Sequence, residues 1–230
     1  MELAEQEMME LVQSRFVIRF LRMVAGLFLF AVGIVMTINA NIGLAPWDVF
    51  HQGLSNAFGI TMGQASILVG IVVVAVDYFA GERIGIGTLG NMILIGLFID
   101  LLMLNHLIPE MQSFLAGVAQ MLVGLFIVGI ASMLYIGAGM GCGPRDGLMV
   151  ALLKRTGRSV SLVRGVLEGG ALVLGWFLGG TVGIGTVITA FFTGPIIQLA
   201  FRMTRFDVKA VKHTYVDQDL KNLGKLLKSN

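Results

Sequence analysis

Six long apolar stretches dominate this chain and limit its fold more than any other feature. A helix needs about 20 apolar residues to cross ~30 Å of hydrocarbon, with a lower limit of about 17. Stretches of that length cover residues 20–40, 64–81, 88–108, 114–136, 160–178 and 184–203. The sequence therefore predicts an all-α, polytopic bundle of about six transmembrane helices in a lipid bilayer.

The composition supports this class and excludes several others. Hydrophobic residues occupy 56% of the 230 positions and charged residues only 13%, whereas a soluble domain carries roughly a quarter charged residues. A soluble enzyme and a disordered chain are therefore excluded. Cys142 is the only cysteine, so no disulfide forms within the chain. The 31 glycines suit helices that pack closely in lipid, because small residues let their backbones approach.

Lysine and arginine predict the orientation, because these residues collect in short cytoplasmic loops. The connections at 41–63, 109–113 and 179–183 contain neither residue, whereas the other connections and both flanks are basic. We therefore expect both termini in the cytoplasm. Residues 1–19 form a cytoplasmic or interfacial segment in this scheme, and residues 204–230 form a basic cytoplasmic tail.

The chain repeats itself without a gap at an offset of 98 residues. Gly-x-x-Pro-x-Asp at 43–48 recurs at 141–146, and Gly-Ile-Gly-Thr at 85–88 recurs at 183–186. Each repeat contains three expected spans, an odd number, so the second must enter the membrane from the opposite side. The sequence thus predicts two inverted-topology membrane repeats. This plan is common in secondary transporters. Alternatively, the duplication serves only to build a stable bundle. The expected repeats cover residues 20–108 and 114–203.

A short amphipathic segment separates the first two spans of each repeat, at 46–56 and at 144–154. Proline suits the first helical position and aspartate suits the positive N-terminal end, so we expect helices that stop before Gly59 and Gly157. They are either half-helices whose N-termini meet at a shared anion-binding cavity or interfacial helices with ordinary first turns. The candidate substrate-binding residues are Pro46, Trp47, Asp48, Pro144, Arg145 and Asp146.

Arg145 stands where the first repeat has Trp47. A guanidinium can bind a carboxylate or phosphate through two hydrogen bonds, and an indole ring can provide a stacking surface. Arg145 can equally be a marker of the cytoplasmic side or a partner of Asp146. The spacing leaves these alternatives open.

Glu168 lies inside the fifth stretch, four residues after Arg164. A charge within a span costs at least ~2.5 kcal/mol on insertion scales, so it should face the bundle interior or a water-filled cavity and have a partner. Arg164 is within pairing reach on the same helix face. We expect a buried ion pair that either joins helices or binds a coupling proton or cation.

The Gly-Ile-Gly-Thr sequences open the third and sixth spans. Successive glycines either form an anion-binding nest or allow close helix crossing, and packing is the default expectation. The residues concerned are Gly85, Gly87, Thr88, Gly183, Gly185 and Thr186.

Other chemistry has little support in the sequence. His51 and His106 fall in the expected outer region without partners at metal-ligand spacing, so we expect no metal. No phosphate-binding loop and no Ser/His or Cys/His constellation occurs, which predicts no cofactor, no enzyme activity and no nucleic-acid partner.

The motifs at 43–48, 141–149, 164–168 and 179–186 together resemble the bacterial YczE/YyaS/YitT family of integral membrane proteins, and its YczE-like branch in particular. The resemblance covers roughly residues 20–203. It implies a multi-pass protein of the bacterial cytoplasmic membrane, and it supplies no reaction or binding residues.

Two functions remain from this reasoning. The first is a secondary transporter or exporter of a small solute, with an anionic solute suggested by the paired helix N-termini. The alternative is a membrane scaffold or accessory protein that localises a cytoplasmic protein partner through its basic tail. The sequence does not identify the solute, the coupling ion or the oligomeric state.

Overall fold

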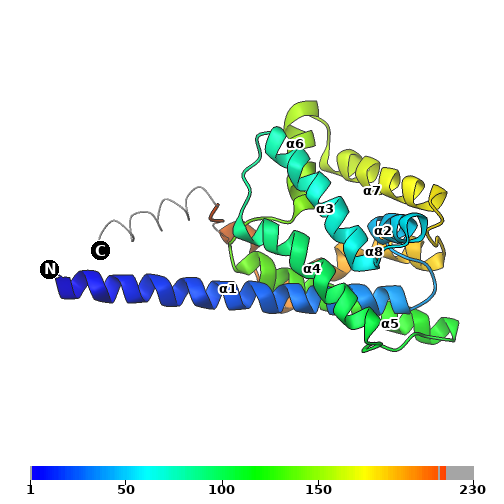
Figure 1. Ribbon diagram of the computed structural model, residues 1–230, viewed down its shortest axis with the longest axis horizontal. Coiled ribbons are helices and arrows are strands. Elements are labelled where there is room, and N and C mark those ends of the chain that lie inside the picture. The colour runs from blue at the N-terminus through cyan, green and yellow to red at the C-terminus, as the bar shows by residue number, and fades with distance from the viewer. Residues whose placement is uncertain (1, 212, 216–230) are drawn as a thin grey trace.

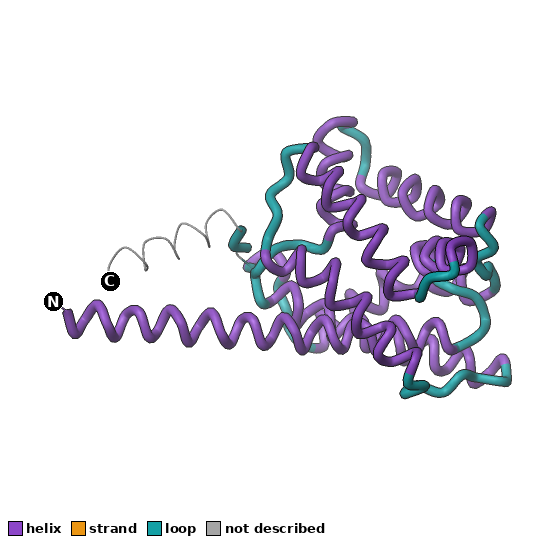
Figure 2. Tube along the Cα trace, viewed as in Figure 1, coloured by secondary structure: helices purple, strands orange, loops and turns teal. Residues whose placement is uncertain are grey.

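The structure is a computed structural model that describes residues 2–211 and 213–215. The described residues form α-helices, one short 3-10 helix and loops, with no strand among them (Figures 1 and 2). Six of the helices are long and apolar enough to cross a membrane, which confirms the predicted all-α bundle. The elements are α1 (Glu2–Asn39), α2 (Pro46–Phe58), α3 (Met62–Phe79), α4 (Ile86–Leu104), α5 (Phe114–Gly137), α6 (Pro144–Thr156), α7 (Val160–Phe177), α8 (Ile184–Met203) and η1 (Val208–Ala210).

α1 is the one span whose start differs clearly from the expected position. Its apolar part begins at Phe16, and the helix itself begins at Glu2, within the expected N-terminal segment 1–19. The helix extends far beyond the rest of the bundle in Figure 1. The N-terminal segment and the first span are therefore one continuous helix.

The two repeats have the same order of helices. α2, α3 and α4 begin at Pro46, Met62 and Ile86, and their counterparts α6, α7 and α8 begin 98 residues later, at Pro144, Val160 and Ile184. α1 and α5, which are also counterparts, pack in opposite directions, because Gly26 meets Tyr135 whereas Gly33 meets Gly124. Opposite directions are what an inverted repeat requires. The side of the membrane from which each repeat enters stays a prediction.

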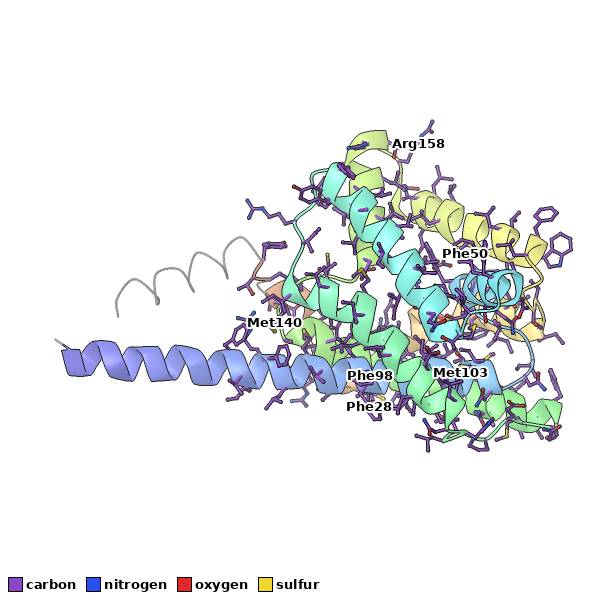
Figure 3. The ribbon with its side chains drawn as sticks, in the orientation of Figure 1. Phe28, Phe50, Phe98, Met103, Met140 and Arg158 are labelled. Atoms are coloured by element: carbon purple, nitrogen blue, oxygen red, sulfur yellow. The ribbon has the colours of Figure 1, made fainter. Side chains whose placement is uncertain are left out.

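The main core lies where α1 packs between α4 and α5. Met23, Leu27 and Met140 are almost completely buried there. Phe28 and Phe98 meet edge to face at this contact, with ring centroids 5.3 Å apart (Figure 3). Met140 belongs to the loop before α6, so this core fixes the loop that leads into the second half-helix.

The repeats differ in how their last two spans pack. α3 lies against α4, where Gly96 meets the Gly63 carbonyl and Asp100 accepts hydrogen bonds from Thr61 Oγ1 and from the Gly63 amide at 2.8 Å. α7 and α8 share no comparable packing. Gly194, the counterpart of Gly96, has no neighbour within 4 Å of its Cβ position. The second repeat is therefore more open than the first.

The described start of the C-terminal segment returns to the bundle. The Thr214 amide donates to the Gly139 carbonyl at 2.8 Å, and Arg19 Nη2 donates to the same carbonyl at 2.7 Å. Phe206 packs against Phe201 of α8. Phe206 and Thr214 thus lie against the end of the bundle at α8 and at the loop after α5, and residues 212 and 216–230 of the expected tail lie outside the described residues.

Candidate functional site

α2 and α6 begin and end as their sequences predict. Pro46 and Pro144 occupy the first turn after an extended residue, and Gly59 and Gly157 end the helices with φ of 65° and 62°. Such positive angles favour glycine, because a Cβ is strained there. In Figure 1, α1 lies along the plane of the view and α2 is seen nearly end-on, so the two helices run in steeply different directions.

The N-terminal turns of the two half-helices contact each other through side chains. Arg145 Cζ lies 4.7 Å from the centre of the Trp47 ring, which is cation–π geometry. Arg145 Nη2 also lies 3.3 Å from His51 Nε2. Trp47 and Arg145, which occupy equivalent positions in the two repeats, therefore touch. Both neighbours of the guanidinium, Trp47 and His51, belong to α2.

His51 extends this contact to Asp48. Arginine has no acceptor, so His51 Nε2 must accept from Arg145 and the ring carries its proton on Nδ1. Nδ1 lies 3.5 Å from Asp48 Oδ1, longer than an ordinary hydrogen bond, and both side chains are buried. Burial lowers the pKa of His51, Asp48 raises it and the Arg145 charge lowers it, which agrees with a neutral ring.

We define the half-helix site as Trp47, Asp48, His51, Arg145 and Asp146. The sequence prediction omitted His51, although its place three residues after Asp48 puts both on one helix face. Pro46 and Pro144 begin the helices and are buried, so they shape the site without polar contacts. Arg145 and Asp146 keep part of their residue surface exposed, whereas Asp48 and His51 are enclosed.

Arg164 and Glu168 form an ion pair on α7, with Nε 2.8 Å from Oε1. The side chain of Arg164 is 53% exposed and that of Glu168 is 26% exposed, so this pair is not buried within the chain as expected. α7 packs mainly against α2 and leaves much of its surface free, which accounts for the difference. Glu168 is still close enough for its charge to act on Arg145.

The glycine amides of the two Gly-Ile-Gly-Thr sequences already form hydrogen bonds within the protein. The Gly87 amide donates to the Met140 carbonyl at 2.6 Å, and the Gly185 amide donates to the Ile42 carbonyl at 2.7 Å. The amides of Gly85 and Gly183 face the hydroxyls of Thr88 and Thr186, at 3.2 and 3.1 Å. These glycines therefore fix the loops before the two half-helices, in keeping with packing rather than with an anion-binding nest.

Two other kinds of site find no support among the described residues. No group of three or more His, Cys, Asp or Glu side chains there has the arrangement of a metal site. A pocket of about 280 Å³ between residues 40–42 and 111–114 shares no residue with the half-helix site and contains no charged side chain. We therefore consider the half-helix site first.

Comparisons with known proteins place the chain among bacterial membrane proteins. Residues 17–202 match the model of a family of unknown function, DUF6198. The chain is 36% identical to the uncharacterized membrane protein YczE of Bacillus subtilis over 190 residues, which covers 82% of this chain and 87% of YczE. An uncharacterized protein of Haemophilus influenzae is 33% identical over 167 residues, covering 73% and 76% of the two chains.

A third relative is more distant. The uncharacterized protein YyaS of Bacillus subtilis is 24% identical over 177 residues, which covers 76% of this chain and 88% of YyaS. No solved structure matches the chain. These similarities agree with the resemblance seen in the motifs.

Proposed function

The chain belongs to the DUF6198 family and is related to the membrane protein YczE, and we propose that it is a secondary transporter of a small solute with one carboxylate or similar anionic group. We place it in the bacterial cytoplasmic membrane with both termini in the cytoplasm. The half-helix site binds the solute, and the protein moves it without catalysing a reaction.

One observation carries this proposal: Arg145 touches Trp47. These residues are 98 positions apart and therefore equivalent in the two repeats. Equivalent residues that meet must lie beside the axis relating the repeats. In transporters built from inverted repeats, the solute binds at this interface, where either side can reach it.

The charges around Arg145 favour one class of solute. Its guanidinium has five N–H donors, of which His51 accepts one, so donors remain for a carboxylate. The negative charges of Asp48, Asp146 and Glu168 act on it. Together with the positive charge of Arg164, this balance disfavours multiply charged anions. A monocarboxylate or a zwitterion fits the site better than a phosphate dianion.

Trp47 offers a direct binding assay, because the chain has only two tryptophans. Trp176 lies exposed near the end of α7, so the Trp176→Phe variant leaves Trp47 as the only indole. Its emission is recorded in the purified, reconstituted protein during titration with monocarboxylates, amino acids and inorganic phosphate. We expect a saturable change with a carboxylate or zwitterion, and little change with phosphate.

Arg145→Gln in the same background keeps a polar side chain but removes the charge. It should abolish the emission change, while Arg158→Gln, at an exposed loop position outside the site, should leave it intact. Solutes that pass this assay are then tested for uptake into proteoliposomes under a pH gradient. A binding signal that survives Arg145→Gln, or a panel with neither binding nor uptake, would contradict the proposal.

A further inference from the structure

Asp77, near the end of α3, is a buried carboxyl group that the proposed solute site does not use. Its side chain is enclosed, with only 3% of the residue surface exposed. No group in the described part of the chain forms a hydrogen bond with Oδ1. Oδ2 lies against Gly147 of α6, where a Cβ would come within 2.5 Å of it. Oδ1 is therefore enclosed, and Oδ2 lies at the contact between α3 and the second half-helix.

The charged groups around Asp77 do not compensate a negative charge. Glu82, just after α3, is itself negative, and Lys154 of α6 is bound to both oxygens of Glu82 at 2.8 Å. Arg155, also of α6, points to the carbonyl of Phe79 instead. Cys142, in the loop before α6, is close enough for the charge of Asp77 to act on it, and it adds no positive charge.

The other two helices packed on α3 supply no cation either. On α4, Asp100 is bound by Thr61 and by the Gly63 amide. On α2, His51 accepts from Arg145 and lies beside Asp48. A carboxylate with neither a donor nor a cation is strongly disfavoured in such surroundings. These surroundings therefore favour the neutral, protonated form of Asp77.

The second repeat shows that packing does not require a carboxyl group here. The counterpart of Asp77 is Gly175 of α7, which packs directly against the α2 backbone at Val49 and Phe50. α7 packs on α2 as the counterpart of the contact between α3 and α6, and more extensively. Glycine is sufficient to close this contact in one repeat, so the carboxyl group in the other has a role beyond filling space.

We propose that Asp77 is the proton-binding site of the protein, and that its ionisation separates α6 from α3. This inference rests on the proposed function, because α6 carries Arg145. Loss of the proton to water leaves a carboxylate that needs hydrogen-bond donors. Water reaches the enclosed Oδ1 when the packing around it opens, and we infer that the Gly147 backbone then moves away from the carboxylate. Proton release at Asp77 therefore shifts Arg145 and couples solute binding to the proton gradient.

Dicyclohexylcarbodiimide tests the protonated state without any solute, because it modifies protonated carboxyl groups in apolar surroundings. The full chain in proteoliposomes is treated at a series of pH values, and labelled peptides are identified by mass spectrometry. We expect labelling at Asp77 that falls about tenfold per pH unit once the acid ionises. Asp100 is the matched control and should stay unlabelled, because both of its oxygens accept hydrogen bonds. No labelling of Asp77, or equal labelling of Asp100, would overturn the proton site.

Cys142 reports on α6, since it is the only thiol and lies two residues before that helix. Its rate of maleimide labelling is compared between the wild-type chain and Asp77→Asn, which stays neutral at every pH. We expect both rates to rise with pH as the thiol ionises, but the wild-type rate to rise at least severalfold more. Matching profiles would show that Asp77 does not move α6.

The Trp47 assay separates this inference from the proposed function. Asp77→Asn should still bind the solute but should lose accumulation driven by a pH gradient. If Asp77 is labelled while Trp47 responds to no solute, the proton site stands and the solute site fails. If solute binds and a pH gradient drives equal accumulation in Asp77→Asn, the solute site stands and proton coupling through Asp77 is wrong.

Discussion

The amide of Gly87 donates to the carbonyl of Met140 at 2.6 Å. The equivalent residues make the equivalent bond: the amide of Gly185, the counterpart of Gly87, donates to the carbonyl of Ile42, the counterpart of Met140. In each case the start of a repeat's last span binds the loop before the other repeat's half-helix. The two repeats are therefore not separate domains. Each one positions the half-helix of its partner, and substitutions at these contacts should affect both.

Gly43→Ala should destabilise the fold more than Gly59→Ala. Both glycines have positive φ, 114° and 65°, and strain in the left-handed region costs about 1–2 kcal/mol for other residues. At Gly43 a Cβ would also lie 2.6 Å from the Gly183 amide nitrogen, whereas at Gly59 it would meet nothing within 4 Å. Thermal unfolding of the detergent-solubilised variants measures the difference. Equal losses of stability would show that the contact with Gly183 is unimportant.

Gly96→Ala and Gly194→Ala form a matched pair at equivalent positions of α4 and α8. A Cβ on Gly96 would lie 2.5 Å from Ile67, so we expect a loss of about 1–3 kcal/mol from overpacking. A Cβ on Gly194 would enter open space, and alanine should stabilise the helix by up to about 1 kcal/mol. Midpoints of thermal unfolding test the signs. A destabilised Gly194→Ala variant would mean that α8 packs more tightly than described.

His51→Phe should weaken solute binding by about tenfold. Phenylalanine fills the buried space but cannot accept from Arg145, and a hydrogen bond to a charged group contributes about 1.5–3 kcal/mol. The guanidinium then loses the partner that orients it. The Trp47 emission titration gives the affinity, and unfolding temperature serves as the control for folding. Unchanged affinity in a folded variant would remove His51 from the site.

Ala57→Cys and Arg155→Cys, each in a Cys142→Ser background, should be labelled from opposite sides of the membrane. These positions are equivalent in the two repeats and both are exposed, near the ends of α2 and α6. An impermeant maleimide applied to intact cells and to inside-out vesicles tests this. We expect Ala57→Cys to react in intact cells and Arg155→Cys in the vesicles. Labelling of both from one side would refute the inverted orientation.

Much of the fold follows from local sequence patterns. The six apolar stretches predict spans whose starts after the first lie within two residues of α3, α4, α5, α7 and α8. Proline and glycine predict both ends of α2 and α6, because their backbone preferences act locally. The 98-residue offset predicts the order of helices in the second repeat from that in the first.

The candidate site depends on contacts that no local pattern contains. Trp47 and Arg145 were singled out as an asymmetry, but only the packing of α2 and α6 brings them within 4.7 Å of each other. His51 has no partner at metal-ligand spacing, and nothing in the sequence shows that Arg145, 94 residues away, lies beside it. Arg164 and Glu168 pair as their spacing predicts, yet their exposure depends on the loose packing of α7.

Asp77 is the clearest case of a residue whose position the sequence predicts but whose contacts only the packing decides. The sequence places Asp77 within an apolar run, and hydropathy alone predicts that this run crosses the membrane. Its burial against Gly147, without a donor to Oδ1, follows from the contact between α3 of one repeat and α6 of the other. Local sequence thus determined which segments are helices and where they end, because helix signals act over a few residues. Only the tertiary structure decided which side chains meet between the repeats, because those distances depend on how distant helices pack.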